Sequence, residues 1–241
     1  MMSLRIGFDI DGVLADFFSS FLEMAAHVLP LADGASLADL DAFSEGDRHK
    51  VWKEIIHTPN WWLRLSPYEP AEIARLYQLS RERKWEVFFM TTRVEIAGDS
   101  VQFQTQWWLE AQGFFLPSVV TVPGSRGDLA NALRIDLLVD DQMLNCAEVI
   151  GASKSKALLM HRTPQSSVRE QATNAGIGVV ESLAEAIEVL ELLDELGPDR
   201  RRSLTKLTDW LPRRKPSRAK PVLPMDPREL RPPAGIEGPQ E

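Results

Sequence analysis

Apolar residues gather into short unbroken runs along the chain, and these alternate with longer stretches in which apolar residues recur every three or four positions. A short run bounded by turn residues is typical of a strand buried on both faces, and the longer spacing is typical of a helix. The predicted strands cover residues 4–10, 85–90, 118–122, 135–139, 156–160 and 177–180. This alternation predicts an α/β, Rossmann-like fold, in which a parallel sheet carries helices on both faces.

The helical stretches have recognisable beginnings and ends. Asp16 is placed to cap the first helix, Pro70 suits a first helical turn, and Gly113 suits the position just after a helix end. The predicted helices cover residues 16–29, 35–43, 47–57, 70–83, 99–112, 127–133, 142–150, 164–175 and 182–196. Residues 30–66 contain short helical pieces and no good strand.

Residues 198–241 differ from the rest of the chain in composition. They contain nine prolines and 11 Lys/Arg against 6 Asp/Glu, whereas the whole chain has a net charge of −8. This composition and the weak periodicity predict a disordered tail. The tail could touch an acidic partner or nucleic acid, or serve only as a solvated, solubilising segment. Residues 1–197 are strongly acidic, which argues against a broad nucleic-acid-binding surface there.

The single cysteine, Cys146, excludes an internal disulfide and favours a reducing cytoplasm with a buried thiol. The first residues lead into a strand without an apolar signal region. No apolar run approaches the roughly 20 residues of a membrane span. We therefore expect a cytoplasmic protein with no membrane partner.

The first predicted strand ends in two acidic residues, within the segment FDIDGV at 8–13. Side chains two positions apart on an extended chain point the same way, so Asp9 and Asp11 can face one ligand. A carboxylate can attack phosphorus, and a second one can protonate the leaving oxygen and later deprotonate water. Gly12 permits a turn around a phosphate. A calcium loop, which lacks its later ligands here, and a helix cap are the alternatives.

The second predicted strand runs into Thr91, Thr92 and Arg93. A hydroxyl and a backbone N–H at a strand end can hold a phosphate oxygen, although a threonine in an ordinary turn is the simpler interpretation. Thr92 and Arg93 are candidate substrate-binding residues, and Arg93 either adds positive charge to the site or is solvated. Because ligands of parallel sheets bind beyond the carboxyl ends of the strands, this cluster and the first can converge if their strands are neighbours.

The predicted strand at 135–139 runs into Asp140 and Asp141. Adjacent acids at the end of a buried strand repel each other unless a cation is present. Mg²⁺ takes one or two carboxylates together with phosphate and water. Asp9, the Asp11 carbonyl and Asp141 would form such a site with Asp140 behind them, and a helix cap is the alternative.

A basic group should offset the charge of the nucleophile and the phosphate. Arg126, one short helix before the fourth strand, is the best candidate, and a surface arginine is the alternative. The four histidines show no metal-ligand spacing. No Walker loop, dinucleotide-binding glycine motif or Gly-x-Ser-x-Gly motif occurs in the sequence.

Taken in order, these clusters resemble the motifs of the haloacid dehalogenase (HAD) superfamily. Residues 8–13 look like its first motif, Thr91 like its second, and the pair at 140–141 like its fourth. Arg126 stands where the third motif normally has a lysine, so the charge is kept but not the compact ammonium geometry. The resemblance covers about residues 4–196.

The resemblance implies a Mg²⁺-dependent phosphohydrolase that forms an aspartyl-phosphate on Asp9 and acts on a small phosphorylated substrate. It also implies a catalytic core of residues 1–16 and 69–197. Residues 17–68 would form a small helical cap inserted after the first strand.

A closer resemblance is to the cytosolic (type C) and mitochondrial 5′(3′)-deoxyribonucleotidases, through DGVLADF at 11–17 and NWW at 60–62. It implies a nucleoside monophosphate substrate, with Phe17, Trp61 and Trp62 around the base. The alternative is that the tryptophans form the core of the cap. This chain has Thr-Thr-Arg where that family has Thr-Ser-Pro. A phosphatase of another phosphoester, a phosphotransferase or mutase, and a phosphate-binding regulatory module therefore stay open.

Overall fold

The computed structural model describes residues 3–29, 43–121, 124–163 and 165–196. The tail at 198–241 lies outside the described residues, as does the predicted helix at 35–43 apart from Phe43, which is not helical. None of the helices within the described ranges has the length and apolar character needed to cross a membrane.

The strands form one parallel sheet, as the sequence predicted. They are β1 (Arg5–Asp9), β2 (Glu86–Thr91), β3 (Ser118–Thr121), β4 (Leu137–Asp140), β5 (Lys156–Met160) and β6 (Gly178–Val180). Their order is β3-β2-β1-β4-β5-β6, and each neighbouring pair is parallel. Since β1 lies between β2 and β4, the three strands that end in acidic or hydroxyl residues are neighbours.

The helices follow the predicted segments closely. They are α1 (Phe17–Val28), α2 (Glu45–His57), α3 (Pro70–Arg83), α4 (Val101–Ala111), α5 (Arg126–Ala132), α6 (Met143–Ala152), α7 (Ser166–Asn174) and α8 (Leu183–Glu195), with a 3-10 turn η2 (Trp61–Arg64). The Asp16 side chain caps α1 by accepting a hydrogen bond from the Ser19 N–H. Pro70 opens α3, and Gly113 has a φ of +88° just after α4.

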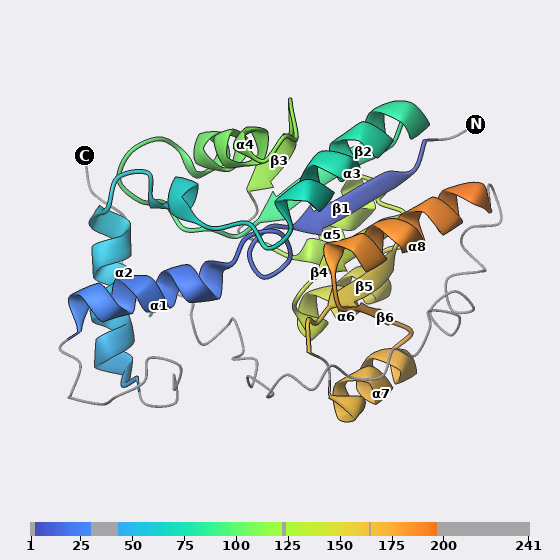
Figure 1. Ribbon diagram of the computed structural model, residues 1–241. Helices are drawn as coiled ribbons and strands as arrows, with labels where there is room; N and C mark the ends of the chain where they lie inside the picture. The colour runs from blue at the N-terminus through green and yellow to red at the C-terminus, as the bar shows by residue number, and fades with distance from the viewer. Residues whose placement is uncertain (1–2, 30–42, 122–123, 164, 197–241) are drawn as a thin grey trace.

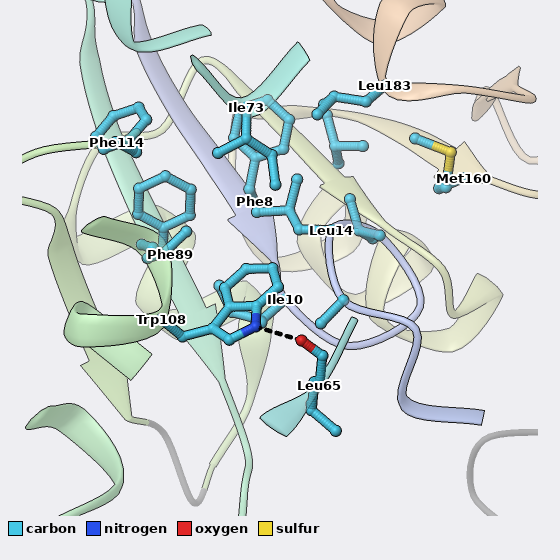
Figure 2. Close-up of a cluster of buried hydrophobic side chains, with 14 of the residues drawn as sticks. Phe8, Ile10, Leu14, Leu65, Ile73, Phe89, Trp108, Phe114, Met160 and Leu183 are labelled. Atoms are coloured by element: carbon cyan, nitrogen blue, oxygen red, sulfur yellow. Dashed lines mark hydrogen bonds between the residues drawn. The ribbon is translucent and has the colours of Figure 1, made fainter. Parts of the chain in front are cut away.

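Each face of the sheet is covered by its own helices (Figure 1). On one face, Phe8 of β1 packs in a core with Ile73 of α3 and Leu183 of α8 (Figure 2). On the other face, covered by α5 and α6, a Cβ at Gly7 would lie 2.8 Å from the Met90 side chain. The central strands are therefore buried on both sides, which explains their unbroken apolar sequences.

The helices α1 and α2 lie to one side of the sheet, beyond the carboxyl end of β1 (Figure 1). The two connections that lead into and out of this region are hydrogen-bonded to each other. The Asp16 N–H donates to the Ser66 carbonyl at 2.8 Å, and the Tyr68 N–H donates to the Leu14 carbonyl at 2.9 Å. That residues 17–68 form a separate cap stays a prediction.

Candidate active site

Polar side chains from three neighbouring strands meet at the carboxyl edge of the sheet. Asp9 is the last residue of β1, Thr91 the last of β2 and Asp140 the last of β4. The register of β1 with β2 and β4 brings these ends side by side. All three residues are buried. The convergence that the sequence predicted is confirmed.

Arg126 reaches this edge from the first position of α5. The Ser125 side chain caps the helix by accepting hydrogen bonds from the N–H groups of Gly127 and Asp128, which starts α5 one residue earlier than predicted. A Cβ at Gly127 would lie 2.6 Å from the Glu148 carbonyl oxygen, so the missing side chain lets α5 pack closely on α6. This packing carries the arginine into the site instead of leaving it at the surface.

The Arg126 guanidinium lies between two carboxylates. Its Nη2 donates a hydrogen bond to Asp9 Oδ1, and its Nε is 3.6 Å from Asp140 Oδ2. The Arg126 Nη1 is buried and has no hydrogen-bond partner within the described residues. A buried donor without a partner costs free energy that a ligand's acceptor would recover. The site therefore offers a donor for an anion directly beside Asp9.

Asp11 is paired with a second arginine. The Arg93 Nε donates to Asp11 Oδ2 at 2.9 Å, and its Nη2 donates to Oδ1 at 2.7 Å. The Arg93 Nη1 donates to Thr105 Oγ1 at 3.1 Å, and the guanidinium carbon lies 4.9 Å from the centre of the Trp62 ring. The Arg93 side chain is fully buried, which excludes the solvated alternative, whereas 24% of the Asp11 side chain is exposed.

The two acids that follow β4 have different surroundings. Asp140 accepts hydrogen bonds from the Gln142 N–H at 2.9 Å and from Asn145 Nδ2, which is 3.0 Å from both carboxylate oxygens. In contrast, Asp141 Oδ1 is buried and lacks a hydrogen-bond partner in the described ranges. The Asp141 carboxylate also occupies the space that a Cβ at Gly12 would need. Asp141 is thus the acid that is free to bind a ligand.

Burial raises the pKa of Asp9, of Asp140 and of Asp141. Repulsion from Asp9 and Asp140 raises the pKa of Asp141 further, whereas Arg126 lowers the pKa of Asp9 and of Asp140. Together with Asp11, four carboxyl groups face only two guanidinium groups. Such a site favours the binding of a cation, which stabilises the ionised carboxylates.

The oxygen donors fit Mg²⁺, and the buried, unpartnered Asp141 Oδ1 is the observation that supports this fit. No three acidic, histidine or cysteine side chains in the described part of the chain are gathered closely enough to hold an ion by themselves. Mg²⁺ usually keeps several waters and takes its remaining ligands from one or two carboxylates and a phosphate. The arrangement is therefore compatible with an ion completed by water and substrate.

The two threonines at the end of β2 point in different directions. Thr91 is buried, and its Oγ1 accepts a hydrogen bond from the Arg93 N–H at 3.2 Å, which leaves its hydroxyl hydrogen to donate elsewhere. Thr92 is exposed. Both lie at the strand end that the sequence indicated.

The aromatic residues before α3 form a buried cluster with α1 and α2. The Phe17 ring centroid lies 5.9 Å from that of Trp61 and 6.0 Å from that of Trp62, and Phe21 and Trp52 complete the cluster. Both tryptophans of η2 are buried, whereas Phe17 is partly exposed. Trp62 Nε1 also donates to the Val94 carbonyl in the loop after β2.

Sequence reasoning missed two residues of this site. Thr105 lies in the middle of α4, and nothing in its spacing connects it with the strand ends. Asn145 lies in the first turn of α6, just after the acidic pair. Its amide side chain could have been predicted to reach the site, because α6 begins directly after the acidic pair at the sheet edge.

No family model matches the sequence, and no curated protein matches it. Among solved structures, the chain resembles a phosphonoacetaldehyde hydrolase-like protein from Oleispira antarctica, with a TM-score of 0.52 and 15% identity over 85% of this chain and 94% of that chain. It also resembles a HAD family hydrolase from Deinococcus radiodurans R1 with bound phosphate and sodium, with a TM-score of 0.48 and 14% identity over 76% and 93% of the two chains. The first of these likenesses confirms the α/β Rossmann-like fold.

Proposed function

We propose that the protein is a HAD-type phosphomonoester hydrolase in which Asp9 is the nucleophile. The observation that carries the proposal is the pairing of buried Asp9 with Arg126, whose Nη1 has no partner among the described residues. A carboxylate beside an unused guanidinium donor suits attack on an anionic phosphoryl group. The order of the sequence motifs supports the same reaction class.

In the first step, a carboxylate oxygen of Asp9 attacks phosphorus. A bond from that oxygen to phosphorus forms as the bond from phosphorus to the leaving oxygen breaks, and Asp11 gives the leaving oxygen a proton. Burial raises the pKa of Asp9, and Arg126 opposes this effect, so Arg126 favours the ionised form that attacks.

In the second step, Asp11 takes a proton from a water molecule, whose oxygen attacks phosphorus and releases inorganic phosphate from Asp9. The free Nη1 of Arg126 and the hydroxyl of Thr91 would hold phosphoryl oxygens in both steps. Thr92, exposed at the same strand end, would contact the substrate nearer to solvent.

The residues that would hold Mg²⁺ are Asp9, Asp141 and the backbone carbonyl of Asp11, with Asp140 behind them. When bound, Mg²⁺ supplies positive charge that offsets the carboxylates and the phosphate. Asn145 would keep the Asp140 carboxylate oriented, because it donates to that side chain.

Within this class, we propose a nucleoside monophosphate as the substrate. Aromatic faces stack on bases, and the partly exposed Phe17 packs against the buried rings of Trp61 and Trp62, next to the loop that carries Arg93. Phe17, as the partly exposed ring, is the member that would meet the base most directly.

The test measures phosphate release from nucleoside 5′- and 3′-monophosphates and from sugar phosphates, with Mg²⁺ or with EDTA. We expect Mg²⁺-dependent release by the wild type and a loss of about 10⁴-fold or more in Asp9→Asn, since removal of a nucleophile has effects of this size. Asp128→Asn, which changes an exposed aspartate of α5, is the matched control and should keep its activity.

Turnover retained in Asp9→Asn would exclude the covalent mechanism. Equal rates on nucleotides and sugar phosphates would exclude a base-specific site while leaving the hydrolase proposal intact. A folded wild type that binds Mg²⁺ but releases no phosphate would instead support a phosphate-binding module.

A further inference from the structure

We propose that Arg93 is a positioning residue for Asp11 and does not contact the substrate. This inference rests on the proposed function, because it assigns to Asp11 the proton transfers described above. It departs from the sequence-based expectation, in which Arg93 was a substrate-binding residue.

The first argument is that the Arg93 guanidinium is fully occupied. Its Nε and Nη2 form a fork on the two oxygens of Asp11, and its Nη1 donates to Thr105. The side chain has no exposed surface. A substrate phosphate could bind Arg93 only by displacing Asp11 or Thr105 from it.

The second argument is that the guanidinium is itself held from three sides. The Thr105 hydroxyl donates to the Val101 carbonyl at 2.7 Å, so its oxygen lone pairs are left to accept from Arg93. The guanidinium carbon lies over the Trp62 ring, and Trp62 is fixed by its own hydrogen bond to the Val94 carbonyl. Stacking and a bidentate fork both restrict an arginine more than a lysine.

The third argument is the contrast with Arg126, which lies on the other side of β1. Arg126 keeps a buried nitrogen without a partner in the described residues, whereas each guanidinium nitrogen of Arg93 donates within the protein. The anion-binding role therefore belongs to Arg126. What remains for Arg93 is to fix the rotamer of a carboxylate that is partly exposed and would otherwise be mobile.

A correctly placed acid matters most when the leaving oxygen is a poor leaving group, because such an oxygen must be protonated as its bond breaks. Loss of Arg93 should therefore affect alkyl phosphates more than aryl phosphates with a good leaving group. A direct contact with the phosphoryl group would affect both substrates alike, because that group is common to both.

The experiment compares kcat/KM for an alkyl phosphate and for 4-nitrophenyl phosphate in the Mg²⁺-loaded enzyme. For Arg93→Met we expect a loss of about 100-fold on the alkyl phosphate and about fivefold or less on 4-nitrophenyl phosphate, since positioned acid–base groups contribute about 10²–10⁴-fold. In an Asp11→Asn background, Arg93→Met should add about threefold or less, because the two residues act as one unit.

Thr105→Val provides a second variant if Arg93→Met fails to fold. This substitution removes the acceptor of Arg93 Nη1 and leaves Asp11 unchanged. We expect kcat/KM to fall about tenfold for the alkyl phosphate alone. This loss is smaller than the roughly 100-fold that a 1 Å misplacement of a reacting group can cost. Arg83→Met is the matched control. Arg83 also pairs with carboxylates and lies over a tryptophan, Trp85, but on α3 away from the site. Arg83→Met should leave the ratio of kcat/KM for the two substrates unchanged.

Equal losses on both substrates, or additive losses in the double variant, would overturn the positioning role. Turnover of 4-nitrophenyl phosphate by the wild type but not by Asp9→Asn would support the proposed function. If the ratio of kcat/KM for the two substrates is then unchanged in the Arg93 and Thr105 variants, only this inference fails. If the wild type turns over neither substrate, the proposed function fails and this inference fails with it.

Discussion

The two sides of Asp9 are built from similar residues but differ in how completely their polar atoms are paired. On the β4 side, which comprises Arg126, Asp140 and Asp141, three buried atoms have no hydrogen-bond partner in the described residues: Nε and Nη1 of the arginine and Oδ1 of Asp141. On the β2 side, which comprises Arg93, Thr105 and Trp62, every guanidinium nitrogen donates a hydrogen bond. Because an unpaired buried polar atom costs free energy, the β4 side gains more from binding a ligand than the β2 side does.

The largest expected effect separates the two arginines by their affinity for phosphate. Arg126→Met should weaken inhibition by inorganic phosphate about 100-fold, because charge-assisted hydrogen bonds to an oxyanion have effects of this size. Arg93→Met should leave the inhibition constant nearly unchanged. Equal weakening in the two variants would contradict the difference between the sides. Arg126→Lys should recover part of the affinity, since it keeps the charge but not the forked donors.

A smaller effect is expected for Asn145, which supports the β4 side from α6. Asn145→Ala removes the amide that donates to Asp140, and we expect Mg²⁺ affinity to fall about 10–100-fold, as for other residues that orient metal-binding carboxylates. The measurement is the Mg²⁺ concentration for half-maximal activity, supported by calorimetric titration. Asn174→Ala, at an exposed position of α7, is the control. Unchanged affinity in Asn145→Ala would contradict the proposed role of Asp140 in Mg²⁺ binding.

A stability effect distinguishes Gly12 from another glycine with a positive φ. Gly12 has φ +84° and Gly176 has φ +74°, so alanine at either position should cost about 1–2 kcal/mol of unfolding free energy from backbone strain. At Gly12 the new methyl group also collides with the Asp141 carboxylate, whereas at Gly176 it meets open space. Urea unfolding should give the larger loss for Gly12→Ala, together with weaker Mg²⁺ binding. Equal losses would contradict the close contact.

The smallest expected effect concerns pH in the absence of Mg²⁺. Burial raises the pKa of Asp9 and of Asp141, so the folded state binds protons more tightly than the unfolded state. The stability contributed by these groups is present below their unfolded pKa of about 4 and is lost as pH rises through the folded values. In EDTA, Tm should therefore decline with rising pH less steeply in Asp141→Asn than in the wild type. Asp128→Asn should follow the wild type. An unchanged slope of Tm against pH in Asp141→Asn would show that ionisation of Asp141 does not destabilise the folded state.

The fold was predictable because each element carries its own local signal. The strand at 156–160 and the helix at 70–83 have the predicted boundaries, since an apolar run and an N-terminal proline define them directly. Cys146 is buried, as expected. The approach of three strand ends was also predictable, because acids and hydroxyls follow strands that a parallel sheet must bring to one edge.

The partners of the site residues were not predictable from their spacing. The contact of Arg93 with Thr105 depends on how α4 packs against the loop after β2, which is a tertiary property. The difference between Asp140 and Asp141 likewise depends on which carboxylate the first turn of α6 captures. Sequence patterns place a residue at an edge, but packing decides which atoms remain free.

The pairing of the two connections at 14–16 and 66–68 has a consequence for engineering and evolution. Because the chain leaves the sheet and returns to it at hydrogen-bonded neighbours, these bonds fix the ends of the intervening segment next to β1 and α3. Closing a longer or shorter loop between fixed ends changes the entropy only slowly. We therefore expect the intervening segment to tolerate changes in its length, provided that the aromatic ring of Trp62 next to Arg93 is kept.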